Sequence, residues 1–348
     1  MDERQPLGLT GQDPCGPLSE KELCPEELLA LQEAAFARDI ARLLARKGEF
    51  LEVPCPACGG ADRRPAFEKH GIAYQSCRRC ETIYASPRPS PDVLAAYYAA
   101  SENYKVWAEH IFPSSEAARR EKIHKVWLER VQTAMAGIGL HGGDMVEIGP
   151  GFGTFAELAR DSGLFGSVRV VEPTPELAAA CRKRGLAVLE TSVEKVPQDF
   201  PPADVVCCFE VVEHLFDPAA FLAKAARLVR RGGLLIATCP NGLGFDIAAL
   251  GASSLAVDPE HLNLFNPESL AGLLRSCGFE PLRIFTPGRL DAEFVREAAL
   301  KGGIDLSGQP LLRRILIDEW ERLGWPFQQF LAANDLSSHM WASARRVG

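Results

Sequence analysis

Apolar and polar positions alternate in two different ways from residue 144 onward. Short apolar runs predict buried strands, and the segments between them have apolar residues three and four positions apart, which predicts helices. Strands and helices that alternate in this way are typical of a parallel sheet covered on both faces. The predicted strands lie near residues 144–149, 167–172, 186–190, 203–209, 233–239, 281–286 and 338–347. The predicted helices lie near residues 154–162, 175–184, 217–230 and 267–277.

The N-terminal part of the chain is less regular. Residues 25–47 have apolar residues at helical spacing, and residues 91–132 predict two helices around the break FPSS at 112–115. Residues 1–17 are rich in glycine, proline and polar residues, which predicts irregular structure. Near the other end of the chain, a mainly helical insertion is expected at 287–337, between the last two predicted strands.

The stretch DMVEIGPGFGTF, residues 144–155, joins a predicted strand to a predicted helix through a glycine-rich turn. Gly149, Gly151 and Gly153 occupy alternate positions, so the third glycine comes one residue too early for the dinucleotide fingerprint G-x-G-x-x-G. No Gly-Lys-Ser/Thr follows, which excludes a phosphate-binding Walker loop. Backbone N–H groups at such a turn point toward a ligand. Because no basic residue is nearby, the turn suits a small carboxylate better than a triphosphate.

Two other strand ends should face the same crevice. Glu172 follows the predicted strand VRVV, and a carboxylate at this place can accept hydrogen bonds from both ribose hydroxyls. Phe209 and Glu210 end the fourth predicted strand, next to the point where the strand order reverses.

An ordered set of motifs resembles the class I S-adenosylmethionine-dependent methyltransferases over roughly half of the chain. The motifs are VEIGPGFG (146–153), Glu172, SVEKVP (192–197), EVVEH (210–214), RLVRRGGLLIATCPN (227–241) and HLNLFNPESLAGLLRSCGFE (261–280). The resemblance implies a Rossmann-like, mostly parallel seven-stranded sheet with helices on both faces. It also implies an enzyme that uses S-adenosylmethionine.

The resemblance assigns cofactor-binding positions residue by residue. The matching residues are Glu147, Gly149, Gly151, Gly153, Glu172, Ser192, Val193, Phe209 and Glu210. By resemblance, the glycines pass close to the methionine part of the cofactor, Glu147 supports their turn, and Glu172 holds the ribose. Ser192 and Val193 lie along the adenine, and Phe209 and Glu210 border the methyl group. Many members have an acid where this chain has Ser192, so adenine recognition is expected to depend more on apolar packing.

Four cysteines have the spacing of a metal site. Cys55 and Cys58 form one C-x2-C pair, and Cys77 and Cys80 form a second pair after 18 intervening residues (59–76). This spacing is typical of a four-thiolate zinc site, which is structural because no coordination position stays open. Free cysteines, a redox pair or an iron–sulfur cluster remain alternatives.

The cysteine motif followed by SPRPSPDVLAAYY resembles a bacterial subgroup in which a small zinc module precedes the methyltransferase domain. Members of this subgroup act on sugars or other metabolites. We therefore expect four parts: an N-terminal helical segment 1–52, a zinc-binding module 53–90, a helical linker or lid 91–142, and an S-adenosylmethionine-binding domain 143–348 that contains the helical insertion.

Methyl transfer from a sulfonium ion needs donor and acceptor in line, and a hydroxyl or carbon acceptor also needs a base. The candidate catalytic residues are Glu210, His214 and His261, because the resemblance places them near the methyl group. His339 could return to the site on the last strand, but a structural role is favoured for it. For Glu213 and His214, a structural role in capping the next helix or ordering its loop is the favoured alternative.

The EVVEH motif leaves a second mechanism open. The spacing E-x-x-E-H resembles one found in ubiquinone-biosynthesis O-methyltransferases, where a divalent ion can assist. Glu210, Glu213 and His214 could converge on magnesium or manganese, because positions three and four apart share one helical face. We favour the reaction without this ion.

Composition and charge limit the classes of partner that this chain can be expected to bind. The chain has 348 residues, 47% of them hydrophobic, and a net charge of −8, which argues against a polyanion as the main partner. A small-molecule acceptor is therefore preferred to RNA gripped by a zinc module, and intact glycines argue against a degenerate, non-catalytic scaffold. The acidic N-terminus lacks the pattern of a signal peptide, and no apolar run approaches the roughly 18 residues of a membrane span, so a cytoplasmic location is expected. The oligomeric state is open.

Overall fold

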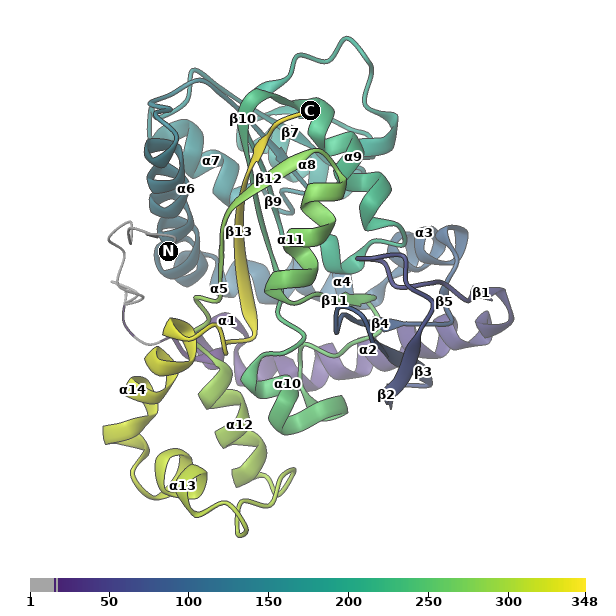
Figure 1. Cartoon of the computed structure of the whole chain (residues 1–348), viewed down its shortest axis with the longest axis vertical. Helices are drawn as coiled ribbons and strands as arrows, with labels where there is room; N and C mark the ends of the chain where they lie inside the picture. The colour runs from purple at the N-terminus through teal and green to yellow at the C-terminus, as the bar shows by residue number, and fades with distance from the viewer. Residues whose placement is uncertain (1–15, 17) are drawn as a thin grey trace.

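The computed structural model describes residue 16 and residues 18–348. The irregular structure predicted for residues 1–17 therefore lies, except for Gly16, outside the described part. Figure 1 shows a central sheet between helices, a small sheet of the N-terminal module on the right, and a group of helices at the lower left.

A seven-stranded sheet forms the centre, with the strand order β12-β13-β10-β9-β6-β7-β8. Its strands are β6 (Asp144–Ile148), β7 (Ser167–Val171), β8 (Ala187–Leu189), β9 (Ala203–Phe209), β10 (Val229–Pro240), β12 (Phe279–Phe285) and β13 (His339–Arg346). The strands β10, β9, β6, β7 and β8 pair in parallel, and β13 is antiparallel to both of its neighbours. The predicted mostly parallel sheet is confirmed.

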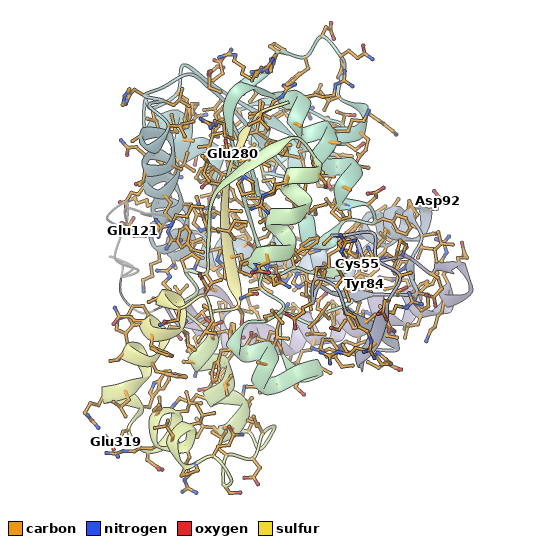
Figure 2. The ribbon with its side chains drawn as sticks, viewed as in Figure 1. Cys55, Tyr84, Asp92, Glu121, Glu280 and Glu319 are labelled. Carbon is orange, nitrogen blue, oxygen red and sulfur yellow. The ribbon has the colours of Figure 1, made fainter. Side chains whose placement is uncertain are left out.

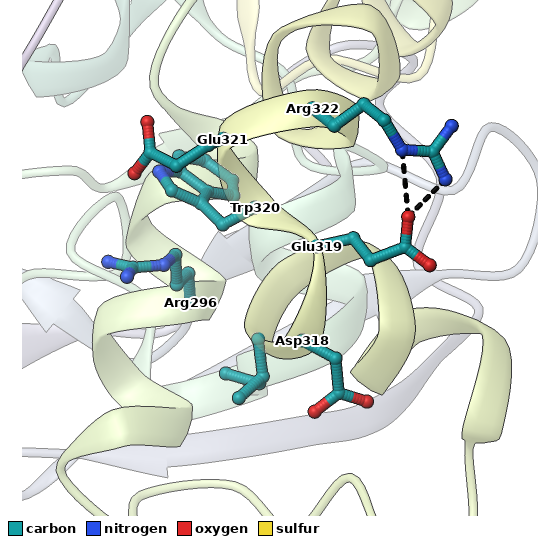
Figure 3. A pocket seen from close by; sticks show the side chains of 7 residues that line it. Arg296, Asp318, Glu319, Trp320, Glu321 and Arg322 are labelled. Carbon is teal, nitrogen blue, oxygen red and sulfur yellow. Dashed lines mark hydrogen bonds and ion pairs between the residues drawn. The ribbon is translucent and has the colours of Figure 1, made fainter.

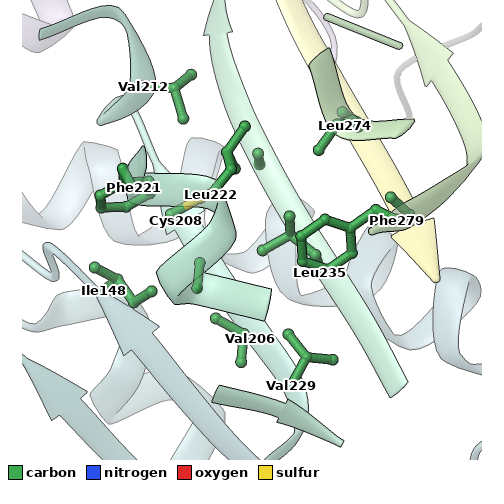
Figure 4. Close-up of a cluster of buried hydrophobic side chains, with 14 of the residues drawn as sticks. Ile148, Val206, Cys208, Val212, Phe221, Leu222, Val229, Leu235, Leu274 and Phe279 are labelled. Atoms are coloured by element: carbon green, nitrogen blue, oxygen red, sulfur yellow. The ribbon is translucent and has the colours of Figure 1, made fainter. Parts of the chain in front are cut away.

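Side chains alternate between the two faces of this sheet because a strand has a period of two. Val206 and Cys208 of β9 join one buried apolar cluster, and Val205 and Cys207 join the other. The first cluster, drawn in Figure 4, includes Phe221 and residues of two helices, α9 (Pro218–Leu228) and α11 (Pro267–Ser276). The second includes residues of α6 (Lys125–Gly137), α7 (Thr154–Asp161) and α8 (Pro175–Lys183). Buried cysteine thus acts as a small apolar residue here.

One prediction about the helices is wrong. Residues 102–137 form one nearly continuous helical run, without a break at FPSS. The run consists of α4 (Glu102–Val106), η2 (Trp107–Ile111), α5 (Phe112–Arg119), η3 (Arg120–His124) and α6. The segment η2 is a wide π-turn, in which the N–H of Phe112 bonds to the carbonyl of Trp107. Such a turn changes the hydrogen-bond ladder just before Pro113, whose missing N–H would otherwise interrupt it.

The N-terminal module has a four-stranded antiparallel sheet with the order β11-β4-β3-β2. The strands are β2 (Arg63–Lys69), β3 (Ile72–Cys77), β4 (Ile83–Ala85) and β11 (Asn263–Leu264), and β1 (Phe50–Leu51) pairs separately with β5 (Arg88–Pro89). The strand β11 comes from the other half of the chain and pairs with β4, with Asn263 opposite Tyr84. The module is therefore joined to the central domain by a shared sheet.

The remaining helices complete the structure. They are α1 (Glu20–Leu23), α2 (Glu26–Ala45), α3 (Pro91–Ala100), α10 (Phe245–Leu250), α12 (Asp291–Leu300), α13 (Pro310–Arg313) and α14 (Trp320–Ala333), with short turns η1 (Lys47–Glu49), η4 (Val193–Lys195), η5 (Val212–His214), η6 (Gly251–Ser253) and η7 (Arg314–Asp318). The last three helices form the expected insertion and share a small core with α10. Among the described residues, no helix is long and apolar enough to cross a membrane.

Candidate active site

The three positions between β6 and α7 require glycine for different structural reasons. All three have left-handed backbone angles, with φ of 68°, 55° and 78° at Gly149, Gly151 and Gly153. A Cβ atom on Gly149 would lie 2.9 Å from Val211 Cγ2, and one on Gly153 would lie 2.9 Å from Cys181 Sγ. A Cβ atom on Gly151 would meet no heavy atom within 4 Å. Packing therefore excludes side chains at the first and third positions, whereas the middle one leaves its backbone open to a ligand.

Glu147 lies two residues before this turn and is only 3% exposed. The N–H of Ala156 stabilises its carboxylate, but Oε2 has no hydrogen-bond partner among the described residues. Burial raises the pKa of Glu147 to about 8. A buried acceptor oxygen without a partner fits a ligand that brings a hydrogen-bond donor or a positive charge.

Glu172 follows β7 and is also 3% exposed. The N–H of Thr174 donates a hydrogen bond of 2.8 Å to Oε1, and the backbone N–H of Gly151 also stabilises the carboxylate. Burial raises the pKa of Glu172, and these hydrogen bonds oppose the rise. Because β6 and β7 are parallel neighbours, Glu172 and the glycine turn lie at the same edge of the sheet.

The two residues expected beside the adenine follow β8, the next strand. Val193 begins η4, is 5% exposed and belongs to the same buried cluster as Ile148 and Val171, the last residues of β6 and β7. Ser192 precedes it and is partly exposed. The structure thus places both residues at the edge of the sheet that carries the glycine turn.

The long helical run covers this edge. Phe112 stacks on Phe152 of the glycine turn with ring centres 3.9 Å apart, and Trp127 stacks on Phe209 at 4.4 Å. Arg120 also forms an ion pair of 2.6 Å with Glu157 of α7. The helices expected as a linker or lid are thus packed directly on the turn and on the end of β9.

Glu210, the first residue of the EVVEH motif, has a partner from the last strand of the sheet. Its Oε1 lies 3.0 Å from Nε2 of His339, the first residue of β13. The backbone of Glu210 has φ of 52°, which is unusual for a residue with a side chain. Partial burial favours the protonated acid, but the charge and hydrogen bond of His339 outweigh it and lower the pKa of Glu210, whose side chain is 40% exposed. The last strand thus brings His339 back to Glu210, the residue expected beside the methyl group.

Glu213, His214 and His261 converge instead. One possible ligand atom from each lies within 4.8 Å of the others, and Nε2 of His214 is 3.9 Å from Oε1 of Glu213. Nδ1 of His214 bonds to the carbonyl of Glu260 at 3.1 Å, and Nδ1 of His261 bonds to the carbonyl of Ala256 at 2.8 Å. Because a carbonyl only accepts hydrogen bonds, each Nδ1 carries a hydrogen, and in the neutral form of either ring Nε2 keeps its lone pair.

Glu213 is not a capping residue. It is fully buried, and neither carboxylate oxygen has a hydrogen-bond partner among the described residues. Burial, followed by the nearby charge of Glu210, raises the pKa of Glu213 well above its usual value. Of the three residues considered for a divalent ion, the structure groups Glu213 and His214 with His261, while Glu210 lies outside that group.

Tyrosines of α3 and α4 form another wall near these groups. The hydroxyl of Tyr97 donates a hydrogen bond of 2.6 Å to Glu260, and burial raises the pKa of that glutamate to about 7. Tyr98 packs edge-to-face on Tyr104, with ring centres 5.7 Å apart. The buried hydroxyl of Tyr98 has no partner among the described residues. This wall therefore offers a polar group to an acceptor.

The four module cysteines come together as predicted. Sγ of Cys55 lies 3.5 Å from Sγ of Cys80, and Sγ of Cys58 lies 3.6 Å from Sγ of Cys77. Four sulfurs around zinc at about 2.3 Å would be about 3.8 Å apart, so the arrangement fits a tetrahedral zinc site. Figure 2 shows Cys55 beside Tyr84 in the module, on the right.

A pocket of about 280 Å³ lies in the helical insertion and is drawn in Figure 3. Arg296, Trp320 and Arg322 are among the residues that line it, and Glu319 forms an ion pair with Arg322 beside it. All lining residues belong to the insertion, so this pocket is separate from the crevice at the sheet edge.

The comparisons with known proteins concern the central domain. Residues 119–284 match the family described as "Methyltransferase domain". A ubiquinone biosynthesis O-methyltransferase from Xanthomonas euvesicatoria is 30% identical over 45% of this chain and 70% of the relative. A probable S-adenosylmethionine-dependent methyltransferase from Mycobacterium tuberculosis is 30% identical over 39% of this chain and 48% of the relative. The chain thus spans about half the length of this mycobacterial relative.

Among solved structures, a SAM-dependent methyltransferase from Thermotoga maritima, described as a possible histamine N-methyltransferase, is 25% identical. The aligned region covers 56% of this chain and 84% of the Thermotoga chain, with a TM-score of 0.41. The match over the central domain and the 30% identity to a relative covered over 70% of its length establish the family. The chain belongs to the class I S-adenosylmethionine-dependent methyltransferases.

Proposed function

We propose that the protein transfers a methyl group from S-adenosylmethionine to a small molecule, with a sugar or surface-polysaccharide precursor as the preferred acceptor class. The observation that carries the cofactor assignment is the open space above the backbone of Gly151, in a turn flanked by two buried carboxylates, Glu147 and Glu172. The sugar class rests on the resemblance of the zinc module and its flanking sequence to a metabolite-modifying subgroup.

The crevice offers a complementary partner for each end of the cofactor. The unpartnered Oε2 of Glu147 suits the cationic amino-acid end, Glu172 suits the ribose hydroxyls, and Ser192 with Val193 suits the adenine. S-adenosylmethionine would supply an electrophilic methyl group on a sulfonium ion. Phe209 and Trp127 would exclude water from that end through their stacked rings.

On the acceptor side, His214 is the proposed base. Its Nε2 carries the free lone pair, and burial, followed by the charge of His261, lowers the pKa of His214 to about 4, so the ring is neutral near pH 7. A neutral imidazole can accept the proton of an acceptor hydroxyl as the methyl group is transferred. Glu210, paired with His339, would then face the sulfonium ion as an anion, and His261 would orient the acceptor.

One observation favours a second, metal-assisted route. Glu213 has two unpartnered oxygens in a fully buried place, and they face two imidazoles whose Nε2 lone pairs are free. A divalent ion held by Glu213, His214 and His261 would satisfy all three and lower the pKa of a bound acceptor hydroxyl. The proposed zinc at the four cysteines is structural in both routes.

Two experiments test these proposals. Calorimetry should show binding of S-adenosylmethionine and no binding of NAD, and absence of cofactor binding would contradict the proposal. Once turnover is measured with a nucleotide sugar, EDTA that leaves the thiolate zinc in place should not reduce it. Loss of activity that magnesium or manganese alone restores would establish the metal-assisted route.

The alternatives make different predictions. An RNA methyltransferase would bind structured RNA tightly at physiological salt, whereas a chain with net charge −8 should bind it weakly and lose it as salt rises. A non-catalytic scaffold would bind no cofactor. We place the protein in the cytoplasm, where its acceptor class and reduced thiols would both be found.

A further inference from the structure

Arg88, at the end of the N-terminal module, is fully buried without a carboxylate partner among its hydrogen bonds. Its Nη1 donates to Oδ1 of Asn263 at 3.0 Å and to the carbonyl of Phe216 at 3.2 Å, and its Nε donates to the carbonyl of Ala85 at 2.9 Å. Burial lowers the pKa of Arg88 to about 10, so the side chain stays charged near pH 7. A buried charge stabilised by carbonyl and amide oxygens ties the module to two loops of the central domain.

Asn263 forms hydrogen bonds both with Arg88 and with the EVVEH turn. While its Oδ1 accepts from Arg88, its Nδ2 lies within hydrogen-bond distance of three carbonyls, those of Val212 and Glu213 at 3.2 Å and that of Leu215 at 2.8 Å. The turn has no side-chain cap of its own. One asparagine amide therefore fixes the backbone that presents Glu213 and His214.

The segment that carries His261 is also held by the module. The hydroxyl of Tyr74 in β3 donates to the carbonyl of Asp258 at 2.5 Å and lies 3.3 Å from that of His261. Three residues beyond Asn263, Nδ2 of Asn266 donates to the carbonyl of Cys80, one of the four clustered cysteines, at 2.8 Å. Acceptor-facing residues on both loops thus depend on contacts with the module.

We infer that the zinc module acts as the positioning element of the acceptor site, and that Asn263 is the residue through which it acts. The cofactor crevice is held separately, by β6, β7, α7 and α8. Loss of the Asn263 contacts should therefore change the acceptor side and leave S-adenosylmethionine binding intact. The activity part of this inference rests on the proposed function, and the structural part does not.

The substitution Asn263→Asp tests the inference sharply. An aspartate keeps the Oδ1 acceptor for Arg88 but has no N–H to give to the three carbonyls, and its charge repels them. Asn334→Asp is the matched control, because Nδ2 of Asn334 donates to one carbonyl, that of Phe330, at an exposed helix end. Asn266→Asp is a milder variant, since it keeps the Oδ1 cap of α11 and loses only the donor to Cys80.

Three measurements on the full chain need no acceptor. In Asn263→Asp, hydrogen exchange of residues 211–216 should rise, and the ¹³Cε1 signals of His214 and His261 should shift or broaden. Calorimetry should give an S-adenosylmethionine Kd within about twofold of the native value, and zinc content should stay the same. Asn334→Asp should change none of these.

With a methyl acceptor that supports turnover, Asn263→Asp should lower kcat by about 10- to 100-fold, as misplacement of catalytic groups does. Unchanged histidine signals, or an S-adenosylmethionine Kd weakened as much as kcat, would overturn the inference. If Asn263→Asp does not fold, the same hydrogen-exchange and histidine measurements on Asn266→Asp test the positioning role. Failure of the native protein to bind S-adenosylmethionine would remove the proposed function, while the exchange and histidine signals would still decide the positioning role.

Discussion

The two sides of the candidate active site are built in opposite ways. The cofactor side comes mostly from one short strand–turn–helix unit, β6 to α7, with Glu172 at the end of the neighbouring strand. The acceptor side is assembled from distant segments, because Tyr98, Glu213, His261 and His339 come from three loops or helices and the last strand. The cofactor groups thus follow neighbouring strands, whereas the acceptor groups are brought together from segments far apart in the chain.

This difference suggests that cofactor binding and the choice of acceptor depend on separate parts of the molecule. A crevice made of adjacent parallel strands can remain the same while the loops around it change. The acceptor side holds the unpartnered groups, such as the Glu213 oxygens and the Tyr98 hydroxyl, that an acceptor or an ion would satisfy. We therefore expect variants on the two sides to have separable effects.

The largest effect should come from removing the metal ligands. The double variant Cys77→Ser, Cys80→Ser should lose the bound zinc, which we expect at about one per chain, and the module should lose several kcal/mol of stability. Elemental analysis and thermal unfolding measure the two changes. Full retention of zinc would show that these cysteines are not the ligands.

The next effect tests the cofactor side alone. Glu172→Ala should weaken S-adenosylmethionine binding by roughly 1.5–3 kcal/mol, because a charged hydrogen-bond acceptor is lost. Titration calorimetry measures this loss, and Glu176→Ala, an acid on α8 four residues further on, serves as the control. Equal affinities in the native protein and Glu172→Ala would remove the glutamate from the cofactor site.

Two glycines of the same turn should respond differently. Gly153→Ala should lower the free energy of unfolding by about 1–3 kcal/mol, because its Cβ would lie 2.9 Å from both Cys181 and Leu186. Gly151→Ala should cost only about 1 kcal/mol through its positive φ but should weaken cofactor binding. Chemical denaturation together with calorimetry distinguishes them, and the opposite order would contradict the packing described for the turn.

The change expected for each single step of the measurement is smallest when the pH is varied. Burial raises the pKa of Glu147 to about 8, so between about pH 4.5 and pH 8 the folded state keeps a proton that the unfolded state has lost. Stability without cofactor should therefore fall as pH rises through this range, by at most about 1.4 kcal/mol per pH unit from this group. Glu147→Gln should remove that part of the slope in denaturation series, and an unchanged slope would show that Glu147 is ionised when buried.

The sequence predicted the strands and the glycine turn well because the patterns that mark them are local. Apolar runs located the seven strands, and the spacing of the glycines located the turn after β6. The spacing of the four cysteines was also enough to predict that they cluster, since each C-x2-C pair forms a turn of its own. The break expected at FPSS was wrong because a π-turn accommodates Pro113 within a continuous helix.

The acceptor side was less predictable because its contacts join residues far apart in the chain. The bond of Glu210 to His339 spans 129 positions, and that of Arg88 to Asn263 spans 175. A lone asparagine or arginine gives no pattern that marks it as buried. The complete burial of Glu213 could not be predicted for the same reason, since it depends on how the loops close over this residue.

The strand β11 has a practical consequence for anyone who wishes to exchange parts between related enzymes. Although the cysteine-bearing module occupies one continuous stretch near the start of the chain, the fourth strand of its sheet is encoded at Asn263–Leu264. A chimera that swaps residues 50–90 alone would combine one parent's sheet with the other parent's edge strand. The exchangeable unit is therefore discontinuous, and a graft that carries residues 254–266 together with the module is the one that keeps their interface native.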